Sequence, residues 1–194
     1  MKNYYFFALA LMLSVSCSKA VSPVDSALDK QILHFGNGSE PQGLDPHIVT
    51  GVPEHHLLIA MCEGLTIANP RGGENLPGMA KSWTISPDGK TYTFFLQEDA
   101  KWSNGDRLTA SDFVWSWMRI LTPSLGSQYP DMLYYVKGAP EYHQGLTNDF
   151  SSVGVTAVND YELKVELTNA TPFFIKLLSH YSTYPVHKDT VLKH

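Results

Sequence analysis

The sequence is poor in the residue types and motifs that signal catalysis or nucleic acid binding. It has only two cysteines, Cys17 and Cys62, and 14 basic residues that never form a run. Because 19 acidic residues outnumber them, the formal net charge is -5, which argues against a nucleic acid partner. No serine nucleophile motif, glycine-rich phosphate loop or zinc-ligand spacing occurs. We therefore expect neither an enzyme nor a protein that carries a metal or another cofactor.

Apolar and aromatic residues, in contrast, are plentiful. The chain of 194 residues is 43% hydrophobic and 12% aromatic, and it contains no low-complexity tract. This composition is typical of a globular protein that can bury a core, and the length fits one domain. The scattered carboxylates Asp99, Asp106 and Asp112 lack a paired acid–base arrangement, so we interpret them as turn and cap residues.

The N-terminus has the pattern of an export signal. A basic residue is followed by the apolar stretch 4–13, which is too short to span a membrane, and then by small residues. Small residues directly before a cysteine resemble a lipoprotein cleavage site, although Ser14 stands where such sites usually have leucine. We therefore predict a signal peptide at 1–16 and a lipidated tether at 17–29 that begins with Cys17. A leader without lipidation is the alternative.

The remaining cysteine and the tryptophans are predicted to be structural. A lipid on Cys17 would leave Cys62 alone, so no disulfide is expected within these residues. Cys62 lies in the apolar run 57–65, which predicts a small core residue. Hairpin and helix spacing likewise places most of the tryptophans in the core, and these are Trp83, Trp102, Trp115 and Trp117.

Residues 77–119 carry the strongest local signals in the chain. The turn sequence Pro-Asp-Gly at 87–89 separates 83–86 from 90–96, which predicts a hairpin. Alternate residues of 90–96 share one face, the pattern of a half-buried strand.

A helix follows the second turn of this stretch, which lies at Asn104 and Gly105. Thr109 stands three residues before Asp112, an approximate capping box. Apolar residues then recur at helical spacing until Pro123, which predicts a helix near Ala110–Leu121.

Weaker patterns predict the other elements. In chain order they are a strand at 31–36, a polar loop at 37–46, a helix at 55–65, a hairpin of strands 153–158 and 161–167 around Asn159-Asp160, and a helix at 173–180 with Thr171 as cap and Pro172 at its first position. The order strand, loop, helix suggests an α/β beginning.

Several motifs occur in an order that resembles one large family. They are residues 37–47 (NGSEPQGLDPH), 51–54 (GVPE), 62–65 (CEGL), 77–119 and 173–178 (FFIKLL). Their order and spacing resemble the extracytoplasmic solute-binding proteins of ABC importers for oligopeptides, dipeptides and nickel, called family 5. The resemblance extends over nearly all of the chain after residue 30 and is greatest to oligopeptide-binding proteins.

The resemblance implies an α/β, periplasmic binding protein-like type II fold of which only the N-terminal portion is present. Members of this family have two lobes hinged around the ligand, and larger members have an extra lobe. By this resemblance, 30–61 begins lobe I, 62–187 forms the smaller lobe inserted in lobe I, and 188–194 starts the return to lobe I. The remainder of the fold would be missing.

The resemblance also implies a peptide site. Oligopeptide binders of this family hold the peptide as an added strand through main-chain groups. In these relatives the loop that matches Thr50, Gly51 and Val52 lines the ligand, and the tyrosine that matches Tyr129 faces the cleft from the opposite lobe. Thr50 replaces an acidic residue, which argues against a preference for basic peptide side chains. An ordinary turn and a surface aromatic residue beside Pro130 are the alternatives.

Three histidines near this loop could suggest a metal site. Adjacent helical residues such as His55 and His56 point about 100° apart and do not chelate one ion together. We therefore interpret His47, His55 and His56 as solvent or loop histidines and expect no metal.

Together these features predict a substrate-binding component of an ABC importer in the periplasm or cell envelope, as a monomer. Its expected partners are an oligopeptide, the ABC permease with its ATPase subunits, and a membrane reached through a lipid anchor on Cys17. A binder of a dipeptide, a cell-wall peptide or a nickel chelate is the alternative within the family. A lobe repurposed as a surface interaction or sensor protein is another, and a hydrolase is a distant third. Residues that fix the peptide termini come later in the family's chains, so this portion alone should bind weakly or not at all.

Overall fold

The computed structural model describes residue 27 and residues 31–194, which fall in two compact units, 1–38 and 39–194. The predicted signal peptide, Cys17 and nearly all of the tether lie outside the described residues. The prediction of a strand at 31–36 is wrong, because no strand forms in the described part of the first unit. A strand needs a hydrogen-bonded neighbour, which weak alternation in the sequence does not supply. Within the described residues, no helix is long and apolar enough to cross a membrane.

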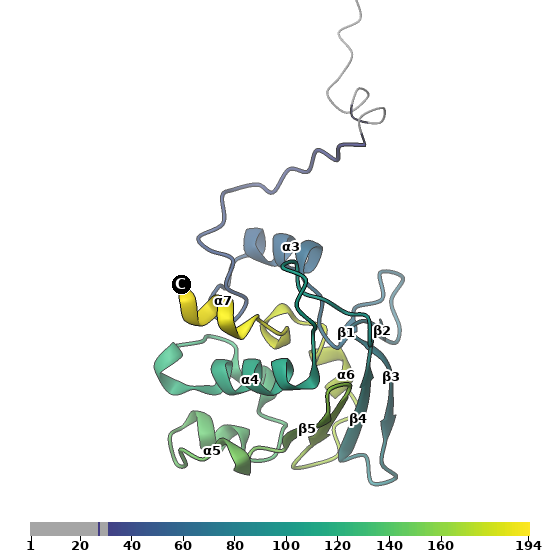
Figure 1. Cartoon of the computed structure of the whole chain (residues 1–194), viewed down its shortest axis with the longest axis vertical. Coiled ribbons are helices and arrows are strands. Elements are labelled where there is room, and N and C mark those ends of the chain that lie inside the picture. The colour runs from purple at the N-terminus through teal and green to yellow at the C-terminus, as the bar shows by residue number, and fades with distance from the viewer. Residues whose placement is uncertain (1–26, 28–30) are drawn as a thin grey trace, which may run out of the picture. The chain divides into compact units, whose positions relative to one another are not determined.

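The second unit is built on a four-stranded antiparallel sheet with the order β3-β4-β6-β5 (Figure 1). Its strands are β3 (Ala80–Ile85), β4 (Thr91–Leu96), β5 (Val155–Asn159) and β6 (Glu162–Glu166). Both predicted hairpins are confirmed, as β3 pairs with β4 and β5 with β6. They join into one sheet because β4 and β6 are also paired, with Phe94 opposite Leu163.

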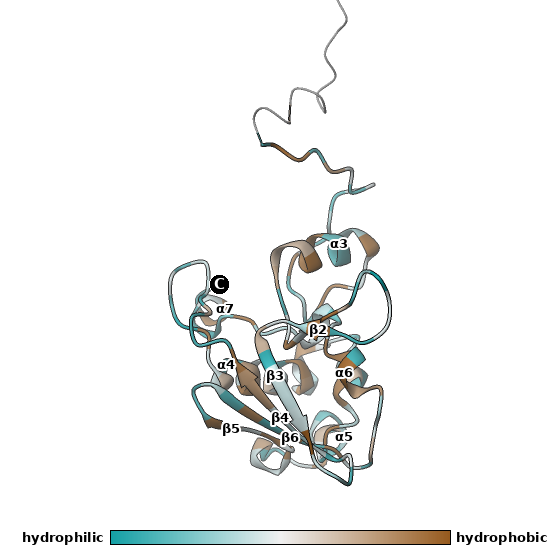
Figure 2. Ribbon diagram, turned by 90° about the vertical axis from the view of Figure 1, so that its right-hand side faces the viewer, coloured by the Kyte–Doolittle hydropathy of each residue, from teal (hydrophilic) through white to brown (hydrophobic). Residues whose placement is uncertain are grey.

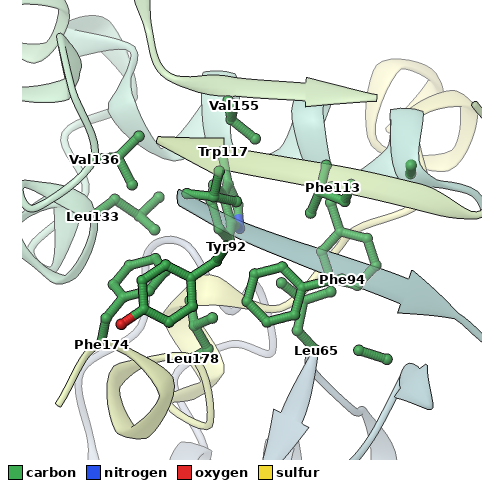
Figure 3. Packing of buried hydrophobic residues seen from close by; sticks show 14 of the residues in the cluster. Leu65, Tyr92, Phe94, Phe113, Trp117, Leu133, Val136, Val155, Phe174 and Leu178 are labelled. Carbon is green, nitrogen blue, oxygen red and sulfur yellow. The ribbon is translucent and has the colours of Figure 1, made fainter. Parts of the chain in front are cut away.

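One apolar cluster holds this sheet to the helices that surround it. Tyr92 and Phe94 on β4 are buried together with Leu163 on β6, as the alternation in the sequence predicts. Phe113 and Trp117 come to the same cluster from α4 (Ala110–Leu121) (Figure 3). The other labelled residues of the cluster are Leu65, Leu133, Val136, Val155, Phe174 and Leu178.

The helix α4 has the bounds that the sequence predicts. The Asp112 carboxylate accepts a hydrogen bond from the backbone N–H of Thr109 at 2.7 Å, so the predicted cap is confirmed. Trp117 is buried, and its indole N–H donates to the carbonyl of Thr183 at 3.0 Å. Trp83 and Trp102 pack half-buried against the cluster, whereas Trp115 is half-buried and is not a member of it.

Short elements complete the second unit. They are α3 (Val52–Met61), the paired strands β1 (Thr66–Ile67) and β2 (Leu76–Pro77), α5 (Ala139–His143), α6 (Phe174–Leu177), α7 (Lys188–Lys193), and the 3-10 turns η1 (Pro123–Leu125), η2 (Pro130–Leu133), η3 (Phe150–Ser152) and η4 (Tyr181–Thr183). Helices α3 and α5 lie at opposite ends of this unit (Figure 1).

Two predicted helices exist with different bounds. The helix expected at 55–65 is α3, which begins and ends earlier. The helix expected at 173–180 is only the four-residue α6. Thr171 does not cap it, because its hydroxyl donates to the carbonyl of Asn169 at 3.0 Å. The chain then turns into η4, where the ring of His180 accepts from the backbone of Ser182.

The prediction that Cys62 is a core residue is wrong. Its side chain is exposed, although Leu58, four residues earlier, is buried. The helix α3 ends at Met61, and the backbone of the next residue, Cys62, is extended, with φ -126 and ψ 162. An extended residue no longer follows the helical face, so the thiol leaves the side on which Leu58 is buried.

Candidate functional site

The predicted ligand loop lies directly before α3. We call residues 45–51 the 45–51 loop. Thr50 is exposed, Gly51 precedes the first turn of α3 with extended backbone, and Val52 is 66% exposed. Only two residues of α3, Glu54 and Leu58, are buried, although the helix carries apolar residues on several sides (Figure 2). The loop and the start of α3 therefore present both backbone and side chains to the outside of this unit.

Gly51 is required here by a close approach. A Cβ atom at position 51 would overlap the carboxylate of Glu54. That carboxylate is buried, and its Oε1 accepts a hydrogen bond from the backbone N–H of Gln42 at 2.6 Å. Glu54 thus ties the start of α3 to Gln42, in the segment before the 45–51 loop. The motif GVPE contributed to the family resemblance, but this role of Glu54 is not apparent from the sequence.

The structure brings Tyr129 to the 45–51 loop. The Tyr129 hydroxyl lies 3.5 Å from the carbonyl oxygen of Thr50, the long end of a hydrogen bond between residues 79 positions apart. Tyr129 is half-buried and directly precedes η2, which begins with the buried Pro130. Two residues that the resemblance assigned to a ligand site are therefore neighbours within one compact unit.

A cluster of aromatic rings surrounds Tyr129. The ring of His180 lies edge-on to Tyr129 with centroids 5.2 Å apart, and it stacks on Tyr181 at 4.4 Å. The ring of His55, on α3, lies 5.6 Å from that of Tyr181. Sequence analysis did not single out His180 or Tyr181. The dense sequence HYSTY at 180–184 is the signal that could have found them.

The titrating groups of this cluster are shifted by their surroundings. Burial lowers the pKa of His180, and the neighbouring His55 lowers it further. Burial also raises the pKa of Tyr181 to about 12, with a smaller contribution from Tyr129. Tyr181 therefore stays protonated, and its hydroxyl donates to the carbonyl of Val49 at 3.0 Å.

His47 lies in the 45–51 loop, as expected, but it is buried, so its interpretation as a solvent histidine is wrong. It is 1% exposed, with Nε2 3.1 Å from the carbonyl of Tyr184 and Nδ1 2.9 Å from Nη1 of Arg119. A guanidinium can only donate, so Nδ1 accepts and Nε2 carries the proton that is donated to Tyr184. Burial, together with the charge of Arg119, lowers the pKa of His47 to about 4. The imidazole is therefore neutral near neutral pH.

The half-buried Asp45 completes this group. Its carboxylate pairs with Arg119 through two bonds, Nη1 to Oδ1 at 3.0 Å and Nη2 to Oδ2 at 2.5 Å. The backbone N–H of His47 also donates to Oδ1 at 3.0 Å. Burial by itself would raise the pKa of Asp45, but the hydrogen bonds from Arg119 and His47 outweigh it and the pKa is lowered.

Comparison with known proteins identifies the family. Residues 75–193 match the family described as bacterial extracellular solute-binding proteins, family 5, middle region. This chain belongs to that family. The resemblance seen in the sequence is thus confirmed, and the family is one of solute-binding proteins.

Relatives of this family 5 chain include periplasmic oligopeptide-binding proteins OppA. The one from Haemophilus influenzae is 39% identical over 191 residues, which cover 97% of this chain and 35% of the relative. The one from Escherichia coli K12 is 42% identical over 167 residues, which cover 85% and 30%. The chain thus spans about a third of the length of the curated relatives that it matches.

Solved structures confirm the α/β fold of a periplasmic binding protein. A crystal structure of Haemophilus influenzae OppA in complex with the peptide RPPGFSPFR has a TM-score of 0.76 and 40% identity, covering 81% of this chain and 31% of that one. The unliganded open form of the periplasmic murein tripeptide-binding protein MppA has a TM-score of 0.75 and 35% identity, covering 80% and 30%.

The other candidate sites of the family 5 chain are weaker. Over residues 31–194 and Ala27, no group of three His, Cys, Asp or Glu residues could hold a metal ion. The rings of His55 and His56 lie 6.0 Å apart.

A mainly apolar hollow of about 760 Å³ lies away from the predicted ligand residues. Residues that line it include Ile59, Met61, Cys62, Trp102, Leu108 and Pro185. It contains none of the predicted ligand residues.

Proposed function

We propose that this chain is the N-terminal part of an oligopeptide-binding protein that captures peptides outside the cytoplasmic membrane. It would deliver them to an ABC permease and its ATPase subunits. The observation that carries the proposal is the contact between Tyr129 and Thr50, which joins both parts of the expected ligand site. The OppA relatives, one of them in a structure with a bound peptide, support the choice of ligand.

The proposed binding mode uses the backbone of the exposed loop. A peptide held as an added strand satisfies its N–H and C=O groups with main-chain partners, so its sequence matters little. Thr50, Gly51 and Val52 would supply one wall of the site, and Tyr129 an aromatic edge beside it. The exposed Thr50 has no charge, so this wall gives no electrostatic preference for basic peptide side chains.

The export and domain assignments belong to the same proposal. Residues 1–16 would be a signal peptide, and Cys17 would carry a lipid that keeps the receptor in the cell envelope near its permease. Such tethering raises the effective concentration of receptor there. Residues 30–61 and 188–194 would contribute to lobe I and 62–187 would form the smaller lobe. The monomeric state and the absence of enzymatic activity are also expected.

A murein peptide is the second candidate ligand. The specific observation that favours it is the similarity to MppA, which is nearly as high as that to OppA. A dipeptide and a purely interacting lobe are further alternatives. A nickel chelate has less support, since no group of three metal-ligand residues occurs among the described residues.

Calorimetry on the full-length product of the gene would test the proposal. A library of tri- to pentapeptides and a murein tripeptide should be titrated in parallel, with the 194-residue chain as a second sample. Binding of many unrelated peptides supports an oligopeptide receptor, and binding of the murein tripeptide alone supports the second candidate. If the full-length protein binds neither, the proposed function is wrong. The 194-residue chain should bind more weakly than the full-length protein.

A further inference from the structure

The 45–51 loop is closed on itself at its base. The backbone N–H groups of Ile48 and Val49 both donate to the carbonyl of Asp45 at 3.1 Å. The tip is open, because Ile48 is 45% exposed and Thr50 is exposed. Local hydrogen bonds therefore shape the loop, but they do not fix where its tip lies relative to Tyr129.

A partly buried polar group, made of Asp45, His47 and Arg119, ties the base of this loop to α4. Arg119, in the last turn of α4 and 74 residues from Asp45, holds the carboxylate with both guanidinium arms. The arm that reaches Oδ1 of Asp45 also lies 2.9 Å from Nδ1 of His47. The side chain of Arg119 is 13% exposed and that of Asp45 is 33% exposed, so these bonds are partly shielded from water.

The same group reaches a third segment of the chain. Nε2 of His47 donates to the carbonyl of Tyr184, one residue after η4, at 3.1 Å. Tyr181, at the start of η4, bonds the loop again at Val49. The loop is therefore held between α4 on one side and the segment that carries the aromatic cluster on the other.

We propose that Asp45, His47 and Arg119 are positioning residues, which hold the tip of the 45–51 loop beside Tyr129 in the geometry that a bound peptide requires. None of the three is proposed to touch the peptide. This inference rests on the proposed function. Since the loop supplies backbone partners, a small displacement of its tip would weaken every main-chain hydrogen bond to a peptide strand.

The chemistry of the group requires arginine. A lysine at position 119 keeps the positive charge, but a single ammonium cannot reproduce the planar fork that holds Asp45 and His47 together. Arg119→Lys therefore tests geometry with the charge unchanged. Lys81→Met is the matched control, because Lys81 forms an exposed ion pair with Glu98 at 3.0 Å on the outside of the sheet. Exposed pairs contribute little to stability.

The test combines peptide affinity with amide hydrogen exchange on the full-length protein. We expect Arg119→Lys to weaken binding of a tetrapeptide mixture about ten-fold, and Lys81→Met to leave it unchanged. The amides of Ile48 and Val49 should exchange faster in Arg119→Lys, while the amides of β4 and β6 keep their protection. A merely structural role would instead raise exchange across the sheet as well.

Two results would overturn the inference. One is unchanged peptide affinity in Arg119→Lys. The other is amide exchange in Arg119→Lys that rises equally in the loop and in the sheet. An Arg119→Lys variant that fails to fold would overturn the inference in the same way. If the unmodified protein binds no peptide, the proposed function fails, while the exchange data on the peptide-free protein still decide whether this group holds the loop.

Discussion

The hydroxyl of Tyr181 donates a hydrogen bond of 3.0 Å to the backbone carbonyl of Val49, 132 residues earlier in the chain. Tyr181 is 2% exposed and forms a small buried cluster with Leu58 and Tyr184. The bond therefore joins the 45–51 loop to η4 from within a packed environment. It links the loop that carries Thr50 and Gly51 to Tyr181, whose ring lies 6.1 Å from that of Tyr129.

Loss of this hydroxyl should destabilise the fold measurably. Tyr181→Phe keeps the ring but leaves the carbonyl of Val49 without this partner, so we expect the free energy of unfolding to fall by about 1 kcal/mol. Urea denaturation would measure the change. Tyr161→Phe is the control, because its hydroxyl has only a long contact of 3.4 Å with the exposed Arg107. Equal stability of Tyr181→Phe and the unmodified protein would contradict a role for the bond.

Removal of the Tyr129 side chain should weaken peptide binding without unfolding the chain. For Tyr129→Ala in the full-length protein we expect about a ten-fold loss of peptide affinity, measured by calorimetry. The reason is that the aromatic ring beside Thr50 is removed. Tyr129→Phe should lose less affinity, since only the hydroxyl and its long 3.5 Å contact with Thr50 are removed. Tyr135→Ala, at another partly exposed tyrosine, serves as the control. Unchanged affinity in Tyr129→Ala would remove this residue from the proposed site.

Stability should depend on pH through His47. The pKa of this imidazole is about 4 in the folded chain, against an ordinary value of 6.5. Between these values the unfolded chain binds more protons, so the free energy of unfolding falls as the pH drops from 6.5 towards 4, at up to about 1.4 kcal/mol per pH unit. Above pH 6.5 this contribution is fully present.

The difference between the unmodified protein and His47→Gln isolates this effect from the carboxylates. Glutamine does not titrate, so the slope of stability against pH between 6.5 and 4 should be smaller in the variant. Chemical denaturation at several pH values in this window would measure both slopes. Identical slopes would mean that His47 is not neutral and buried in solution.

A side chain at position 51 should disturb the start of α3. In Gly51→Ala the added Cβ would overlap the Glu54 carboxylate, which must then move and lose its bond from Gln42. We expect a loss of about 1–3 kcal/mol in the free energy of unfolding, from overpacking and the broken bond. Gly36→Ala is the control, because a Cβ there has open space. Comparable stability of the two variants would show that Glu54 can move at little cost.

Lipidation of Cys17 has a direct test in cells. Because the thiol is the proposed attachment point, Cys17→Ser should release the mature protein from the membrane fraction. Fractionation and immunoblotting would measure this, with Cys62→Ser as the control that stays on the membrane. A Cys17→Ser protein that remains in the membrane fraction would argue against the anchor.

Local patterns predicted much of the sheet and its main helix. Turn chemistry at 87–89 and alternation in 90–96 specified a hairpin, and Thr109 with Asp112 specified where α4 begins. Such signals succeed because the interactions that stabilise them join residues close together in the chain. The strand predicted at 31–36 failed because a strand depends on a distant neighbour.

The site could be predicted only in part. The resemblance of motifs pointed to Thr50 and Tyr129. The burial of His47 and the roles of His180, Tyr181 and Glu54 did not follow from the sequence. Their surroundings are set by residues far away in the chain, such as Arg119, which lies 72 residues from His47. Nothing within a local window distinguishes a buried histidine from a solvated one.

Motifs, turns and caps act over short stretches of chain, so the family, the two hairpins and the bounds of α4 follow from the sequence. The exposure of Cys62, the burial and neutral state of His47, and the attachment of the 45–51 loop to α4 and η4 depend on the folded chain. Burial and the partners of a polar group depend on contacts between distant segments, and these form only when the chain is folded.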